Sequence, residues 1–351
     1  MTNINNKLKL GVAYHGNRML HHVREDMQDI IKHNFNLVVH MFSHNDWDRH
    51  KNIMKEIVEI TEGAGLEVWI DNWGLGGPPG DKSHFLSYFP DAHQVYSNGE
   101  VDPVRVCLNN KDFRRFTREW IDVVEFTGAK SIFWDEPHLA GRDLVDGKPS
   151  VWTCYCQTCR ELFEEKYGRK MPDQMTEEIE KFRIDTIVSY FREVTAYSKS
   201  KGMYNAVCVM LGATHGINLD TLDQIAGMDT LDNIGSDPYW VSTDVNPYHY
   251  VYEATMKNLD ICDRFKKDHN IWIQCFGNPR GREEEIIYAA DAAYDAGART
   301  ILAWGYYGSD ANDYRARNPE LTWKTMGDAM YRLLERNRNS ERDAYLSTVK
   351  R

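Results

Sequence analysis

The sequence predicts an α/β protein with a (β/α)8 barrel, formed by a single domain over residues 1–351. Eight short apolar runs alternate with longer amphipathic segments along the whole chain. The runs are continuously apolar, which is typical of parallel strands buried on both faces. No low-complexity linker interrupts the alternation, and barrels of this kind reach this length as one domain.

Each predicted strand is a short apolar run that ends in polar or aromatic residues. The eight runs are 8–15, 36–42, 66–71, 131–135, 204–211, 233–237, 271–276 and 300–304. Amphipathic helices are predicted between them at 23–33, 52–63, 112–126, 177–201, 248–267 and 283–296, with a less regular connection at 220–229. Several helices end at or just before a glycine, a common way for a chain to leave a helix: Gly63, Gly128, Gly202 and Gly297.

Two connections are much longer than the rest. Residues 72–105 follow the third strand and are rich in Gly and Pro, and residues 139–175 follow the fourth. Both leave the carboxyl ends of strands, where barrels of this fold place their active sites. We therefore expect these long loops to shape a substrate cleft.

Composition limits the partners that we expect. The 42 Lys and Arg against 53 Asp and Glu give a net charge of −11, without a basic stripe, so nucleic acid is not an expected partner. No apolar run has membrane-spanning length, and residues 1–7 lack the apolar stretch of a signal peptide, so we expect a soluble, cytoplasmic protein. A homo-oligomer is left open.

Polar and aromatic side chains gather at the predicted strand ends. Carboxylates, amides and aromatic rings together suit a carbohydrate site, so a carbohydrate is the expected substrate. Each residue also has a simpler interpretation, such as a helix cap for Asp71 or a structural hydrogen bond for His15. The predicted substrate-binding residues are Tyr14, His15, Asp71, Asn72, Trp73, His138, Tyr239, Trp240, Gln274 and Trp304.

The predicted catalytic residues are three acids. Asp135 and Glu136 are adjacent at the end of the fourth strand, so their side chains point to opposite sides of it. Crowding of two carboxyl groups raises one pKa, as a general acid at neutral pH requires. Asp237, after the sixth strand, is the next candidate.

Four cysteines predict a structural zinc ion. Cys154, Cys156 and Cys159 lie within one short segment, and Cys107 lies upstream. Four thiolates complete a tetrahedral shell and leave no position open for catalysis. Unrelated free thiols are the alternative. A disulfide framework is not expected, because the cysteines number seven and no export signal is present.

Two motifs resemble known glycoside hydrolases. Trp134-Asp135-Glu136-Pro137 resembles the Asn-Glu-Pro that ends the fourth strand of clan A barrels. Cys107 with Cys154-Tyr155-Cys156-Gln157-Thr158-Cys159, followed by Leu162-Phe163 and Tyr167-Gly168, resembles the zinc cluster of family 42 β-galactosidases. The resemblance implies a barrel glycosidase, with Glu136 as acid/base and a structural zinc held by the four cysteines.

The sequence departs from that pattern at two places. Asp135 stands where the clan has Asn, and the seventh strand, Ile271 to Asn278, carries no carboxylate for a nucleophile. Two assignments follow. Asp135 and Asp237 would be nucleophile and acid/base if the chain is similar to the α-galactosidase clan. Alternatively, an inverting reaction needs an acid and a base about 6.5–9.5 Å apart.

The predicted function is hydrolysis of an O-glycosidic bond in an intracellular oligosaccharide or glycoside. One alternative is a metal-dependent sugar isomerase or epimerase that places a divalent ion among strand-end residues. Those residues would be His15, Asp71, Glu136, His138 and Asp237. Another alternative is a barrel that binds carbohydrate without catalysis.

Overall fold

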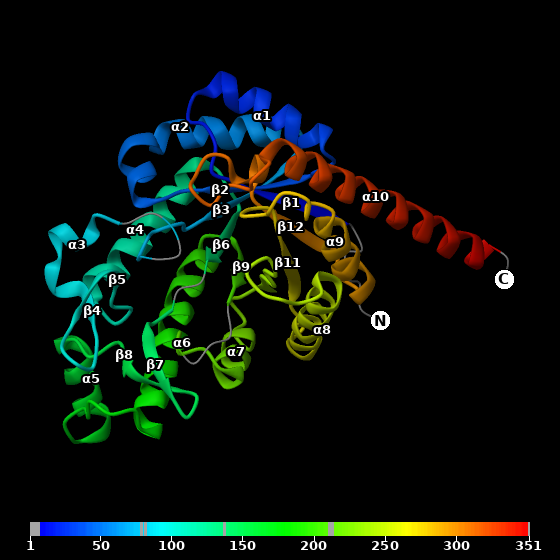
Figure 1. Cartoon of the computed structure of the whole chain (residues 1–351). Helices are drawn as coiled ribbons and strands as arrows, with labels where there is room; N and C mark the ends of the chain where they lie inside the picture. Colours follow the sequence, from blue (N-terminus) through cyan, green and yellow to red (C-terminus); the bar gives the residue numbers. More distant parts are fainter. Residues whose placement is uncertain (1–7, 78–79, 81–82, 136–137, 210–213, 350–351) are drawn as a thin grey trace. The chain divides into compact units, whose positions relative to one another are not determined.

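Eight parallel strands form a closed barrel, in the order β1-β12-β11-β10-β9-β6-β3-β2 (Figure 1). The computed structural model describes residues 8–349, except 78–79, 81–82, 136–137 and 210–213. The predicted (β/α)8 fold is confirmed, and each predicted strand is present. The barrel strands are β1 (Lys9–Tyr14), β2 (Leu37–Met41), β3 (Glu67–Asp71), β6 (Ser131–Asp135), β9 (Tyr204–Cys208), β10 (Asn233–Ser236), β11 (Asp268–Gln274) and β12 (Thr300–Trp304).

The chain divides into two compact units. The first comprises residues 1–41, 55–69 and 234–351, and the second comprises residues 42–54 and 70–233. The single domain predicted for residues 1–351 stays a prediction.

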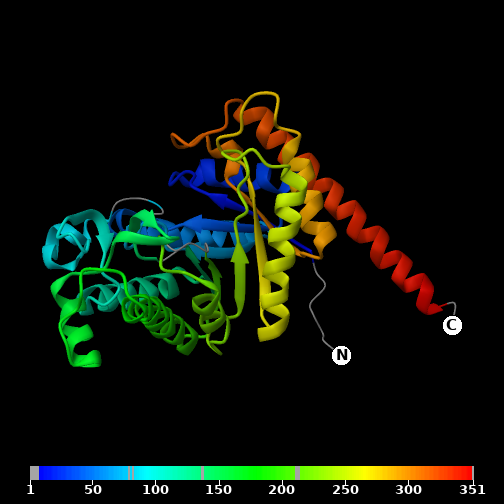
Figure 2. The same cartoon turned by 60° about the horizontal axis from the view of Figure 1, so that its bottom comes forward.

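In the first unit, β1 lies between β2 and β12. Gly11 of β1 pairs with Leu37 on one side and Leu302 on the other. The helices of this unit follow the strands in the chain, and α8, α9 and α10 lie side by side (Figure 1). Figure 2 shows α10 continuing well beyond its contacts with α9. The helices are α1 (Leu20–Lys32), α8 (Pro247–Phe265), α9 (Glu285–Ala296) and α10 (Pro319–Val349), with the short η2 (Tyr306–Ser309).

In the second unit, β6 pairs with β3 and with β9. Asp71 of β3 pairs with Phe133, and Asp135 of β6 pairs with Cys208. Helices α4 (Lys111–Thr127), α6 (Glu177–Ser200) and α7 (Leu219–Ala226) pack on one another in this unit. The α4 helix begins where the side chain of Asn110 accepts from the amide of Phe113, and it ends at Gly128, whose φ is 91°.

Both long connections after β3 and β6 contain structure of their own. The first contains α3 (Phe85–Tyr88), η1 (Pro90–Ala92) and the hairpin of β4 (His93–Val95) with β5 (Val101–Val106). The second contains the hairpin of β7 (Gly141–Val145) with β8 (Lys148–Trp152), and then α5 (Gln157–Tyr167). Both insertions occur where the sequence predicted them.

Helix α2 (His44–Gly63) begins eight residues before the predicted position, residue 52. The Ser43 hydroxyl accepts from the amide of Asp46, 3.2 Å away, and the Asp46 carboxylate accepts from the amide of Ser43 at 3.1 Å. This reciprocal capping starts a polar first turn in which apolar periodicity gives no signal. Within the described part of the chain, no helix combines the length and apolarity needed to cross a membrane.

Gly235 allows β10 and β11 to approach closely. A Cβ atom at this residue would lie 2.0 Å from Oδ1 of the buried Asn270. Gly235→Ala should therefore lower the free energy of unfolding by about 1–3 kcal/mol, because the core has no room for a methyl group. Gly63→Ala is the control, since a Cβ atom at Gly63 would have nothing within 4 Å. Urea denaturation checks the pair, and equal effects at the two glycines would contradict the argument.

Candidate functional site

The four predicted cysteines come together in the second unit. Cys107 follows β5, and the other three lie just before or within the first turn of α5. All four are buried, and their Sγ atoms lie within 4.8 Å of one another. The Sγ of Cys107 is 3.5 Å from that of Cys159 and 3.6 Å from that of Cys156. Tetrahedral coordination with metal–sulfur bonds of about 2.3 Å separates sulfurs by about 3.8 Å, so the four residues fit a metal ion.

The close packing of the thiols opposes the ionisation of Cys107 and Cys159. Hydrogen bonds with the neighbouring thiols, together with burial, raise the pKa values of Cys107 and Cys159 well above the usual range. Four thiolates would therefore not coexist without a positive ion. The Nδ2 of Asn109 donates to the Sγ of Cys159 at 3.4 Å, as an outer-shell amide does in metal sites.

A buried arginine holds the chain that enters the cluster. Arg183 of α6 donates to the backbone oxygens of Thr153 at 2.8 Å, Ala140 at 3.2 Å and Thr214 at 3.1 Å. Burial lowers the pKa of Arg183 to about 10, against smaller raising effects of Glu180 and Cys154. This residue was missed by the sequence analysis, although a cation on the apolar face of a helix could have indicated it.

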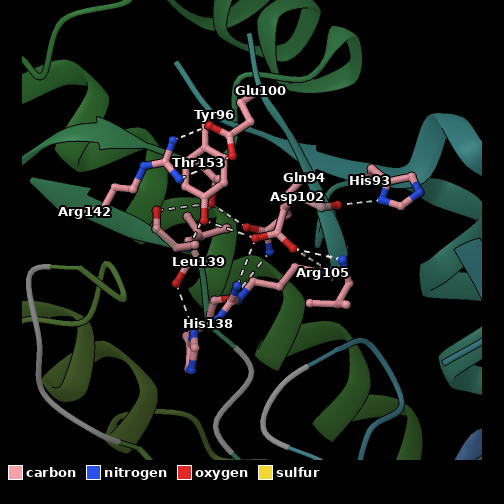
Figure 3. Close-up of polar contacts among 12 residues, drawn as sticks. His93, Gln94, Tyr96, Glu100, Asp102, Arg105, His138, Leu139, Arg142 and Thr153 are labelled. Carbon is pink, nitrogen blue, oxygen red and sulfur yellow. Dashed lines mark hydrogen bonds and ion pairs between the residues drawn. The ribbon is translucent and has the colours of Figure 1, made fainter. Parts of the chain in front are cut away.

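A polar network ties the β4–β5 hairpin to the segment after β6 (Figure 3). The Nε2 of Gln94 donates to the backbone oxygens of Val106 at 3.2 Å and His138 at 3.4 Å. The hydroxyl of Thr153 donates to the amide oxygen of Gln94 and accepts from the amide of Ala140 at 2.8 Å. Hydrogen bonds of Gln94 thus connect His138, which follows the predicted catalytic acids, to Thr153, which directly precedes Cys154.

The same figure shows how the two hairpins are joined (Figure 3). The buried carboxylate of Asp102 accepts from Tyr96 Oη at 3.1 Å and from Arg105 Nη1 at 2.9 Å. Arg142 of β7 pairs with Glu100 and lies over the Tyr96 ring, 4.6 Å from its centroid. Exposed ion pairs contribute little to stability, so the buried part of this network, centred on Asp102, matters more.

The strand ends in the second unit bring Asp71, Asn72 and Asp135 together. Asn72 Oδ1 accepts from the amide of Asp135 at 2.9 Å, which fixes the end of β6 against the end of β3. Asp71 is fully buried, and no described side chain bonds its carboxyl group. Burial raises the pKa of Asp71 well above its usual value, against a smaller lowering by the amide of Trp73. A neutral carboxyl of this kind can donate a hydrogen bond.

His138 follows the predicted acids and is neutral at physiological pH. Burial, the ring of His215 and the charges of Arg105 and Arg183 lower its pKa to about 3. Its ring lies 4.3 Å from that of His215, centroid to centroid, and its Nδ1 lies 3.0 Å from the oxygen of Leu139. With the proton on Nδ1, Nε2 is left to accept from a ligand hydroxyl. Glu136 itself lies outside the described residues.

In the first unit, aromatic side chains meet at two strand ends. His15, after β1, packs edge-on against Trp304 of β12 with centroids 5.3 Å apart. Tyr239 packs in the same way against Phe276, at 5.0 Å. Asp237 lies just after β10 and is half-buried. The predicted binding roles of His15, Tyr239 and Trp304 and the predicted catalytic role of Asp237 stay predictions.

Three predicted binding residues of the first unit have structural partners instead. The Tyr14 hydroxyl donates to Asp26 Oδ2 at 2.5 Å, and its ring is fully buried. Trp240 is also fully buried and donates to Glu285 Oε2 at 2.8 Å. The Gln274 amide accepts from Val241 N at 3.1 Å and donates to Phe276 O at 3.1 Å. The binding roles of these three residues stay predictions, and the proposal below does not depend on them.

The end of β11 adds one residue that the sequence analysis did not select. Asn278 is fully buried, and neither Oδ1 nor Nδ2 has a partner among the described residues. Native proteins rarely leave a buried amide unsatisfied, so this group suits a ligand or a water. Among the acids that follow, Glu285 lies in the first turn of α9, where a negative charge favours the helix.

Comparison with known proteins identifies the fold alone. No family model and no curated protein matches the chain. Several solved structures have similar folds. The catalytic domain of a β-amylase from Paenibacillus polymyxa is 10% identical with a TM-score of 0.64, over 92% of this chain and 98% of that one.

Two further solved structures have similar folds. Gan42B, a GH42 β-galactosidase from G. stearothermophilus, is 12% identical with a TM-score of 0.70, over 95% of this chain. The match spans only 57% of that longer chain. A D-allulose 3-epimerase from Methylomonas sp. is 11% identical with a TM-score of 0.51, over 94% of this chain and 98% of that one. The similar structures thus include glycosidases and an epimerase.

Buried neutral histidines predict that acid destabilises the protein. Burial is the largest cause that lowers the pKa values of His15 and His44 to about 4 and of His40 and His138 to about 3. Unfolded histidine titrates near pH 6.5, so below that value the unfolded chain binds protons that the folded chain does not. The melting temperature should fall between pH 7 and pH 5.

Asp71 provides the control for this pH dependence. Its raised pKa acts in the opposite sense, because a carboxyl that protonates more readily when folded stabilises the fold as pH falls. Asp71→Asn should therefore steepen the fall of the melting temperature. A melting temperature that is constant or rises from pH 7 to pH 5 would contradict the burial of neutral imidazoles.

Proposed function

We propose that this chain is a glycoside hydrolase that cleaves an O-glycosidic bond of an oligosaccharide or glycoside inside the cell. One observation carries the proposal. Asp135 ends β6 of a closed parallel barrel, its amide is held by Asn72, and Glu136 follows it in the sequence. The carboxyl ends of barrel strands are where enzymes of this fold place their catalytic groups.

The proposed chemistry uses two carboxyl groups. One donates a proton to the leaving glycosidic oxygen, and the other attacks the sugar or activates a water. Glu136 and Asp135 are the candidates after β6, and Asp237 is the candidate after β10. Two assignments remain. In one, Asp135 is the nucleophile and Asp237 is the acid/base. In the other, the reaction inverts the anomeric centre by activating a water. The anomer first released, observed by NMR, separates retention from inversion.

We assign sugar contacts to the half-buried rings and to the polar groups with spare hydrogen-bonding capacity. Trp73, Tyr239 and Trp304 are half-buried, as rings that pack on a pyranose would be. Neutral His138 can accept from a hydroxyl at Nε2, and the unsatisfied amide of Asn278 can both donate and accept. Asp71, Asn72 and His15 complete the proposed set.

We further propose that the four cysteines hold a structural Zn²⁺, in line with the resemblance to family 42. Cys107, Cys154, Cys156 and Cys159 supply the four ligands, and the bound ion would neutralise their charge. The hydrogen bonds of Thr153 and Gln94 then connect the cluster to the chain after β6, so that a bound ion would help to hold this chain in place.

A sugar epimerase is the second candidate, favoured by the fold likeness to the D-allulose 3-epimerase. It requires a metal ion among the strand-end residues. Among the described residues, two groups of three or more candidate ligands lie within 4.8 Å, and neither contains His15, Asp71, His138 or Asp237. Turnover that EDTA abolishes, without release of a new reducing end, would favour the epimerase.

Removal of the catalytic carboxylates tests the hydrolase. A panel of nitrophenyl glycosides should include a substrate that the protein cleaves. On it, Glu136→Gln, Asp135→Asn and Asp237→Asn are each expected to lower kcat, with at least about a hundredfold loss for the true acid or nucleophile. Asp143→Asn, on the exposed β7–β8 hairpin, is the matched control and should keep the wild-type rate.

The outcomes separate the candidate functions. Wild-type rates in all three variants would refute the assignment of the catalytic residues. Sugar binding that Glu136→Gln leaves unchanged, in a protein that turns over no glycoside, would instead identify a carbohydrate-binding barrel.

Loss of one cluster thiol should destabilise the fold strongly. Cys156→Ala removes one of four ligands and should lower the free energy of unfolding by about 3 kcal/mol or more, because metal binding is coupled to folding. Cys262→Ala, a buried thiol of α8 outside the cluster, should cost only about 1 kcal/mol. Elemental analysis and thermal melts check both variants, and purified protein without bound zinc would contradict the proposal.

A further inference from the structure

A second group of metal-binding side chains lies in the second unit, away from the cysteine cluster. His44 and Asp48 lie one turn apart at the start of α2, and His84 immediately precedes α3. One candidate ligand atom from each lies within 4.8 Å of the others. His84 Nε2 is 2.7 Å from Asp48 Oδ2, and His44 Nε2 is 3.9 Å from Asp48 Oδ1.

A contact with Ser83 fixes the orientation of the His44 ring. Its Nδ1 lies 2.9 Å from Oγ of Ser83, and Ser83 Oγ also accepts from the amide of Phe85 at 3.2 Å. With Nδ1 donating to Ser83, Nε2 presents its lone pair toward Asp48.

The group formed by the three residues contacts aromatic side chains on one side and is partly exposed to solvent on the other. His44 is buried against Phe116, with ring centroids 4.5 Å apart, and Trp47 stacks on the same Phe116 at 4.9 Å. The Asp48 and His84 side chains are 50% and 35% exposed. A cation can therefore reach the three ligands from solvent, and water can fill the rest of its shell.

One adjustment is required. The two imidazole rings stack with centroids 3.7 Å apart and planes 15° from parallel. In this arrangement the Nε2 lone pairs of the two rings are nearly parallel. Two such lone pairs converge on a single ion only if one ring tilts. His84 is the ring with room to move, because it is partly exposed and lies just outside a four-residue helix.

We propose that His44, Asp48 and His84 bind a divalent transition-metal ion of the zinc class, which ties the start of α2 to α3. Two imidazoles and one carboxylate are ligands typical of Zn²⁺, with Ni²⁺ and Cu²⁺ as competitors. This site is independent of the proposed hydrolase activity. It uses none of the strand-end residues and none of the four cysteines.

The rival interpretation is a surface hydrogen bond between His84 and Asp48 with no metal. Calorimetric titration of the full chain separates the two. Protein whose cysteine cluster is loaded with zinc is desalted and titrated with Zn²⁺ at pH 7.5. The metal site requires a further equivalent of Zn²⁺ per chain and a higher melting temperature in its presence.

Variants assign the binding to these residues. Asp48→Asn and His84→Gln change partly exposed side chains and should each weaken Zn²⁺ binding by at least about tenfold. His50→Gln, on the same helix, is the matched control and should bind like the wild type. Co²⁺ at this site should lack the thiolate charge-transfer band that a cysteine site gives. Absence of a further equivalent, or undiminished binding by His84→Gln, would overturn the proposal.

Discussion

Parallel pairing of β6 with its two neighbours determines where the acidic side chains of the second unit lie. Asp135 is the last residue of the strand, paired with Cys208, and its amide is bonded by Asn72 from the end of β3. A slip of one residue would turn every side chain of the strand to the opposite face. The contact between Asn72 and the amide of Asp135 opposes such a slip at the end of the strand.

Two buried polar groups lack a side-chain partner in the described part of the chain. The Asp71 carboxyl and the Asn278 amide are fully buried, and no described side chain satisfies them. Each such group costs about 1–3 kcal/mol relative to a satisfied one. Each lies at or shortly after a strand end of its own unit, where a ligand could complete its hydrogen bonds, as the proposed binding roles require.

The sequence predicted the parts of this structure that local pattern determines. Continuous apolar runs located all eight barrel strands, and the short spacing from Cys154 to Cys159 located most of the cysteine cluster. The β7–β8 hairpin was missed, although Asp146-Gly147 at its turn, with φ of 49° and 75°, is a common hairpin signal. Its strands carry few apolar residues, so no alternation marked them.

Side-chain partners were harder to predict, because they depend on residues distant in the chain. Tyr14 and Trp240 were expected to face a ligand, whereas the structure bonds them to Asp26 of α1 and Glu285 of α9. A strand end shows that a side chain is near the rim, but not whether it points to the opening or to the helices. The pairing of His44 with His84, forty positions later, is likewise invisible to periodicity.

The two kinds of chemistry proposed for this chain require different surroundings, and the second unit supplies both. Carboxyl groups that transfer protons need spare hydrogen-bonding capacity and a perturbed pKa, and the raised pKa of Asp71 shows that this strand end can perturb a carboxyl group. A structural ion needs the opposite, a closed shell that offers no position to substrate or water. The four cysteines would close that shell, while the buried Arg183 holds the backbone between them and the strand end through Thr153 and Ala140. A metal ion bound by strand-end carboxylates would instead occupy the groups that hydrolysis needs. We therefore assign metal binding to the cysteines and catalysis to the acids.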